Sequence, residues 1–106
     1  MKYVVDIDGT ICSITDGKYD DAVPNEDRIA KINKLYDEGN QIIYLTARGM
    51  GRSGNNADLA KETFYELTKN QLDRWGCKYH KLFLGKPSGD YYIDDKGMSA
   101  NEFFGD

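Results

Sequence analysis

The stretch YVVDIDGTIC, residues 3–12, places two aspartates, Asp6 and Asp8, at the end of a short apolar run. The β-branched residues before them predict a strand over residues 2–7. Side chains two positions apart on a strand point to the same face, so the two carboxylates face the same way. Gly9 follows at once and lets the chain turn out of the strand. A buried strand that ends in this way indicates a functional site rather than a solvated turn.

Length and composition limit the classes of protein. A chain of 106 residues is expected to form one domain, spanning residues 1–106. The net charge of −4 and the single histidine argue against a nucleic-acid partner, which selects for basic surfaces. The sequence contains neither a signal peptide nor an apolar run of the roughly 18 residues that a membrane span needs. The two cysteines form no metal-binding pair, so a reduced, cytoplasmic protein is expected.

The rest of the chain alternates between extended and helical patterns. Asp16-Gly17 predicts a type I′ turn inside a hairpin over 12–24. Asn25 is placed to cap a helix that ends at Gly39. A glycine-rich loop is expected over 48–56. The other expected elements are strands over 41–45, 81–85 and 91–95, a helix over 57–75, and a short helix that begins near Ser99 and includes Phe103.

This order of elements predicts an α/β fold with a single Rossmann-like parallel sheet, flanked by helices and carrying a β-hairpin flap after the first strand. Such sheets bind ligands beyond the carboxyl ends of their strands. Polar residues follow every predicted strand, so one edge of the sheet is expected to collect them. They are Asp6 and Asp8, Thr46, Lys86, and the pair Asp94 and Asp95.

That collection of side chains predicts phosphoryl transfer. Crowded carboxylates repel one another and need a cation, and Mg²⁺ is the hard divalent ion that suits oxygen ligands best. The hydroxyl of Thr46 and the ammonium of Lys86 suit the oxygens of a phosphate group. A carboxylate can itself attack phosphorus and form an aspartyl-phosphate. The reaction is therefore assigned to Asp6.

The motifs resemble those of the haloacid dehalogenase (HAD) superfamily of phosphohydrolases, over residues 2–96. Four motifs occur in the order that the family shows: DIDGT, the threonine of IIYLT, Lys86, and the end of YYIDD. The strings LTAR, LGKP and YYIDDK are most similar to small phosphatases associated with capsular polysaccharides. The resemblance implies a nucleophile at Asp6 and a general acid and base at Asp8. It also implies Mg²⁺ ligands from Asp6, from the Asp8 carbonyl and from Asp95, with Asp94 beside it.

The two positions where this family inserts a cap domain have no room for one, so the chain resembles a capless member. An open site suits a large substrate, or one that a neighbouring subunit of a homo-oligomer covers. The expected substrate is a small phosphorylated sugar, polyol or related metabolite. Its proposed contacts include Thr10, together with Arg48 and Arg52, which flank the glycine-rich loop and suit a second anionic group.

Three other functions use similar residues. A phospho-accepting receiver domain also combines acidic residues, threonine and lysine, but in it the acidic pair comes first and here it comes last. A polynucleotide-end phosphatase shares the capless form, whereas this chain is acidic and shows no basic, aromatic groove. A catalytically silent assembly subunit is disfavoured by the intact motifs.

Overall fold

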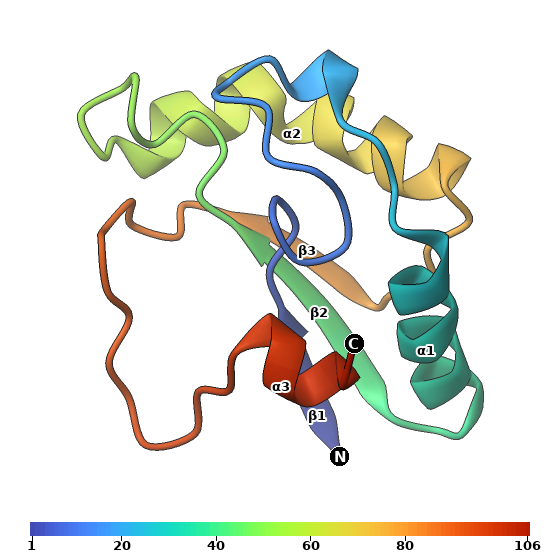
Figure 1. Ribbon diagram of the computed structural model, residues 1–106. Helices are drawn as coiled ribbons and strands as arrows, with labels where there is room; N and C mark the ends of the chain where they lie inside the picture. The colour runs from blue at the N-terminus through green and yellow to red at the C-terminus, as the bar shows by residue number, and fades with distance from the viewer.

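A three-stranded parallel sheet forms the centre of the protein. The computed structural model describes residues 1–106, and its strands are β1 (Lys2–Val5), β2 (Gln41–Thr46) and β3 (Lys81–Leu84). They lie in the order β1-β2-β3, and both pairings are parallel (Figure 1). Val5 is the register partner of Tyr44, and Thr46 is the partner of Leu84. The carboxyl ends of the strands therefore meet at one edge, as expected.

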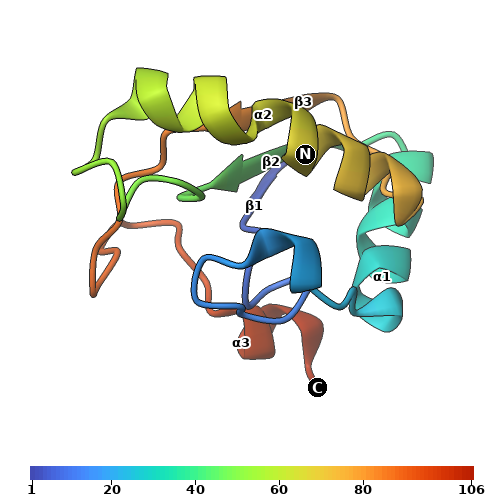
Figure 2. The same cartoon turned by 90° about the horizontal axis from the view of Figure 1, so that it is seen from above.

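Four helical segments surround the sheet. They are the 3-10 helix η1 (Tyr19–Asp21), α1 (Glu26–Asp37), α2 (Ala57–Arg74) and the short α3 (Ala100–Phe104). The side chains of Asn25, Asn56 and Ser99 cap the three α-helices, each by accepting a backbone N–H three residues on. Figure 2 shows α2 along the β3 side of the sheet and α3 beyond β1. The three predicted α-helices are confirmed.

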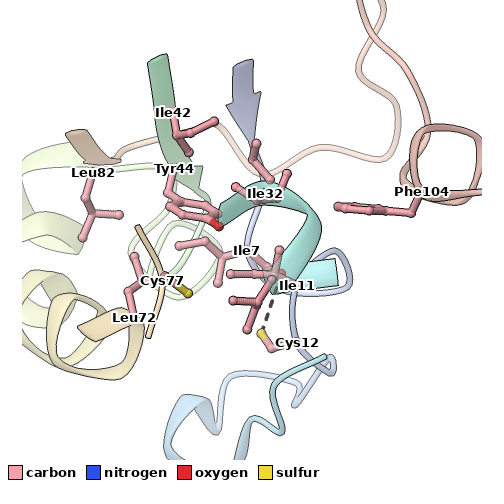
Figure 3. Close-up of a cluster of buried hydrophobic side chains, with 12 residues drawn as sticks. Ile7, Ile11, Cys12, Ile32, Ile42, Tyr44, Leu72, Cys77, Leu82 and Phe104 are labelled. Carbon is pink, nitrogen blue, oxygen red and sulfur yellow. Dashed lines mark hydrogen bonds between the residues drawn. The ribbon is translucent and has the colours of Figure 1, made fainter. Parts of the chain in front are cut away.

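The buried core holds the loop after β1 in place. Ile7 and Ile11 of that loop are fully buried in a cluster that draws on every strand and α-helix (Figure 3). Each of these two side chains removes apolar surface from water, which contributes about 1.5–3 kcal/mol. Because Ile7 and Ile11 are anchored inside, the polar residues between and beside them are presented at the sheet edge. The other members shown in Figure 3 include Ile32, Ile42, Tyr44, Leu72, Cys77, Leu82 and Phe104.

The predicted hairpin over 12–24 is wrong, although its turn is correct. Asp16 and Gly17 both have positive φ, and the Lys18 N–H donates to the Thr15 carbonyl at 3.2 Å. The flanking residues do not pair as strands, apart from a single bridge between Cys12 and Pro24. The second half instead forms η1, because the Tyr19 ring packs edge-on against Phe64 of α2, with ring centroids 5.0 Å apart. No flap stands over the sheet edge.

The predicted fourth strand over 91–95 is also wrong. This segment forms no strand, and Tyr91 and Ile93 are 87% and 93% exposed. Asp94 instead accepts the backbone N–H groups of Lys96 and Gly97, a local turn that competes with strand pairing. The neighbourhood of β1 is taken by α3, whose Phe103 ring lies 5.9 Å from that of Tyr3. The sheet therefore has three strands.

The structure also bears on membrane-spanning helices and on the state of the two cysteines. No helix is both long enough and apolar enough to cross a membrane. Cys12 and Cys77 are buried and free, so neither takes part in a disulfide. Burial raises the pKa of the Cys12 thiol to about 12 and that of Cys77 to about 11, which keeps both protonated near neutral pH. Cys12 is thus a packed residue and not a nucleophile.

Candidate functional site at the carboxyl ends of the strands

A tight turn presents the two aspartates of the loop after β1. The Thr10 and Ile11 N–H groups both donate to the Ile7 carbonyl, at 3.0 and 2.9 Å. Gly9 has φ +80°, and a Cβ at this position would lie 3.1 Å from the Ile14 side chain. Glycine is therefore required here for both its conformation and its size. The turn places the Asp6 and Asp8 side chains on either side of the buried Ile7.

Asp6 lies beside the predicted ammonium group of Lys86, but the neighbouring hydroxyl is that of Thr10 and not that of Thr46. The Thr10 hydroxyl donates to Asp6 Oδ2 at 3.2 Å, and Lys86 Nζ lies 3.7 Å from Asp6 Oδ1. The backbone N–H of Lys86 donates to the Thr46 carbonyl at 3.2 Å, which fixes the start of its loop. Its ammonium also lies over the Tyr92 ring. The Asp6 side chain is 35% exposed, so a ligand can reach it.

The charge of Asp6 is set by opposing effects. Partial burial raises the pKa of its carboxyl, and the positive charge of Lys86 is the largest effect in the other direction. Hydrogen bonds from the Ile7 N–H and the Thr10 hydroxyl also lower the pKa, and the net result is a pKa above the ordinary value for aspartate. Desolvation thus makes the ionised form of Asp6 less stable, and a less stable carboxylate is a stronger nucleophile.

The back of this loop is tied to the C-terminal segment. Arg28 Nη1 donates to the Thr10 carbonyl at 3.1 Å, while its Nη2 forms an ion pair with Asp106 at 2.6 Å. Arg28 Nη2 also donates to Asn101 at 2.9 Å. Arg28 thus links the carbonyl of Thr10 to two residues at the far end of the sequence. The sequence motifs carry no sign of this link.

Asp8 is held by Arg48 in a two-point contact. Arg48 Nε donates to Asp8 Oδ2 and Arg48 Nη2 donates to Asp8 Oδ1, both at 2.9 Å. Parallel guanidinium–carboxylate bonds of this kind are among the strongest hydrogen bonds in proteins. The Cys12 thiol also lies 3.4 Å from Asp8 Oδ1. The Asp8 carboxylate is therefore oriented by its neighbours and not by solvent.

The position of Arg48 differs from the one expected. The sequence places it in an open loop, available to a substrate anion, whereas its side chain is fully buried. The reason is a polar socket on α2, where Arg48 Nη1 donates to Gln71 at 2.7 Å and to Thr68 at 3.3 Å. The guanidinium carbon also lies 4.8 Å from the centre of the Tyr19 ring. In this arrangement Arg48 contacts Asp8 in place of a ligand.

Thr46 and Arg52 also have structural contacts. The buried Thr46 hydroxyl oxygen accepts the backbone N–H of Arg48 at 3.1 Å, and so shapes the turn after β2. Arg52 Nη2 donates to the Gly17 carbonyl at 2.6 Å and its guanidinium lies over the Tyr19 and Phe64 rings. Arg52 thereby joins the loop after β2 to the loop before η1. Neither side chain approaches Asp6 through a hydrogen bond.

The acidic pair Asp94 and Asp95 does not join the other carboxylates. Both residues lie in the exposed segment between β3 and α3, which extends away from the sheet in Figure 1. Nowhere in the chain do three or more acidic, histidine or cysteine side chains come together as metal ligands. Both oxygens of Asp8 are engaged by Arg48, which leaves Asp6 as the one free carboxylate at the edge. This donor set does not fit a complete Mg²⁺ site.

Comparison with known proteins supports the fold. No protein-family model matches the chain, and no curated protein matches it. One solved structure is similar. It is the crystal structure of a structural-genomics target from Vibrio cholerae, with 27% sequence identity and a TM-score of 0.88, covering 97% of this chain and 86% of that one. That protein carries no stated activity, so the chemistry must be argued from the site.

Three residues of the site escaped the sequence reasoning. Tyr19, Thr68 and Gln71 build the socket of Arg48, and Gln71 Nε2 also donates to the Tyr19 carbonyl at 2.6 Å. A signal for Gln71 was present in the sequence. It lies four residues after Leu67 and seven after Phe64, on the apolar face of the helix over 57–75. A polar side chain on such a face requires a buried partner.

Proposed function

We propose that this protein hydrolyses phosphomonoesters through an aspartyl-phosphate formed on Asp6. The observation that carries the proposal is the grouping of Asp6, Thr10 and Lys86. A reachable carboxylate lies next to a hydroxyl donor and an ammonium group, at the edge where a parallel sheet binds its ligands. The motif order, which resembles that of the HAD phosphohydrolases, supports the same assignment.

The proposed reaction has two steps. An oxygen of Asp6 forms a bond to phosphorus while the bond from phosphorus to the leaving oxygen breaks, and that oxygen takes up a proton. A water molecule then attacks the phosphorus of the aspartyl-phosphate, loses a proton, and releases phosphate and the free carboxylate. Lys86 and the Thr10 hydroxyl offset the negative charge that gathers beside Asp6. We assign the proton transfers to Asp8, whose oriented carboxyl group lies two residues from Asp6.

Dependence on Mg²⁺ is a separate part of the proposal, and it rests on the resemblance alone. Mg²⁺ is commonly held by one or two carboxylates, several waters and the substrate phosphate. Asp6 supplies one such carboxylate, whereas Asp94 and Asp95 lie in an exposed segment and would have to approach it. No step of the reaction above is derived through the metal.

The first test is a phosphate-release assay on the purified chain. Sugar phosphates, polyol phosphates and nucleotides are compared with Mg²⁺, with Ca²⁺ and with a chelator. We expect hydrolysis of small sugar or polyol phosphates with Mg²⁺ and lower rates with Ca²⁺, which accepts more ligands at longer distances. Full activity in chelator contradicts the metal proposal only. If no phosphate ester is hydrolysed under any condition, the proposed function is wrong.

The pH dependence follows from the environment of Asp6. Only the ionised carboxylate can attack, so kcat/KM should fall at acid pH, with an inflection above the ordinary pKa of aspartate. Lys86 lowers the pKa of Asp6, so Lys86→Met should move this inflection to still higher pH. Profiles of kcat/KM for the two proteins provide the measurement. An inflection that stays in place on removal of Lys86 contradicts the assignment to Asp6.

The substrate class remains a proposal based on shape and charge. The segments after β1 and after β2 each hold loops and one α-helix, with the short η1 added after β1, and a chain with a net charge of −4 repels long polyanions. These features favour a small phosphorylated metabolite over a polynucleotide end. We retain Arg52 as a proposed substrate contact, since its loop begins beside the site. A second subunit that covers the open edge is also part of this proposal.

A further inference from the structure

We propose that Arg48 is a positioning residue, which fixes the orientation of the Asp8 carboxylate for the reaction. The inference rests on the proposed function and adds a role that the motifs do not contain. Sequence reasoning assigned Arg48 to the substrate, whereas the structure buries it completely against Asp8.

The socket leaves Arg48 little freedom. Four N–H groups of Arg48 have oxygen acceptors, because Nε and Nη2 donate to Asp8 while Nη1 donates to Gln71 and Thr68. Nη2 also lies 4.0 Å from Cys12 Sγ. The Tyr19 ring covers the guanidinium, and the Tyr19 hydroxyl accepts the N–H of Gly49, the next residue along. A planar group held on its edges and its face has one orientation. Arg48 thus transmits the placement of α2 and η1 to Asp8.

The effect on Asp8 is geometric. Each Asp8 oxygen accepts one N–H of the fork, which fixes the plane of the carboxylate. In this conformation Asp8 is therefore ready to accept a proton from water. To protonate a leaving group, it must first take up a proton and release one N–H of Arg48.

The test is a double-mutant cycle on Asp8→Asn and Arg48→Ala. We expect Arg48→Ala to lower kcat about a hundredfold with little change in KM, because a misplaced catalytic group costs a factor of that order. The double variant should be no slower than the slower single variant, since both remove the same function. If the effects of the two substitutions on kcat multiply, Arg48 acts through the fold alone. If KM rises while kcat stays constant, Arg48 binds the substrate. Either result overturns the proposal.

Chemical rescue separates positioning from structure. Free guanidinium at low millimolar concentration should restore part of the kcat of Arg48→Ala, whereas Arg48→Lys, which lacks the planar fork, should remain slow. Arg74→Ala provides the matched control, because Arg74 is an exposed arginine on α2, outside the site. Its activity should match the wild type with and without guanidinium. Failure of guanidinium to restore any activity to folded Arg48→Ala contradicts positioning.

A second variant and a second readout cover the remaining outcomes. If Arg48→Ala does not fold, Gln71→Met provides a second variant, which keeps Arg48 and Asp8 and removes one acceptor of Arg48. It should lower kcat about tenfold. Independently of activity, the Nε proton of Arg48 should exchange slowly with water by NMR, and rapidly in Asp8→Asn. Rapid exchange in the wild type overturns the inference. Slow exchange in a protein with no phosphatase activity instead overturns the proposed function.

Discussion

Asp6→Asn is expected to abolish phosphate release while the protein stays folded. The amide has nearly the shape of the carboxylate and can still accept the hydrogen bond that Thr10 donates. It cannot attack phosphorus, so no aspartyl-phosphate can form. Loss of a nucleophile from a catalytic set lowers kcat by about 10³-fold or more. The measurement is phosphate release under the condition that gives the highest wild-type rate.

Stability provides the control for this variant. The pKa of Asp6 is higher in the folded protein than its ordinary value, so the ionised form is favoured less in the folded state than in the unfolded chain. The contribution of Asp6 to the free energy of unfolding thus declines as the pH rises from its ordinary pKa through its pKa in the folded protein. Near neutral pH the ionised carboxylate lowers the free energy of unfolding. Asp6→Asn removes that cost and should raise Tm slightly. Wild-type-like hydrolysis by folded Asp6→Asn would exclude Asp6 as the nucleophile.

The local patterns of the sequence predicted most of the fold. The predicted cap at Asn25, the helical spacings and the apolar runs of three strands depend on neighbouring residues, and these elements occur where expected. The grouping of Asp6 with Lys86 also followed, because parallel strands bring their carboxyl ends to one edge. Predictions that needed only local chemistry and the rule for parallel sheets therefore succeeded.

The failures involve competition between distant parts of the chain. The apolar residues 91–93 favour a strand. Asp94, however, forms a local turn, and α3 packs beside β1. Likewise, nothing near Arg48 in the sequence indicates that its side chain turns inward. That outcome depends on Gln71 and Thr68, which lie more than one turn of helix inside α2 and far along the chain. A contact of this kind leaves at most a polar residue such as Gln71 on the apolar face of a helix, and that sign does not identify its partner.

Leu72→Ala is expected to give the largest loss of stability among substitutions in the helices that support the site. Leu72 is fully buried in the cluster that also contains Ile7 and Ile11, and it follows Gln71 directly on α2 (Figure 3). Leucine-to-alanine changes at such positions cost about 2–5 kcal/mol, from lost burial and from the cavity that remains. Domains are stable by about 5–15 kcal/mol, so this loss is a large share of the total. Urea denaturation measures it.

Leu59→Ala is the matched control, because it makes the same change on the same helix at a side chain that is 48% exposed. Its cost should stay within about 0.5 kcal/mol, as for most surface substitutions. Equal midpoints for the two variants would show that the interior face of α2 is not the one described. Leu72→Ala also tests how the core supports the site. A cavity beside Gln71 loosens the socket of Arg48, so kcat should fall even at temperatures where Leu72→Ala remains folded, and it should not fall in Leu59→Ala.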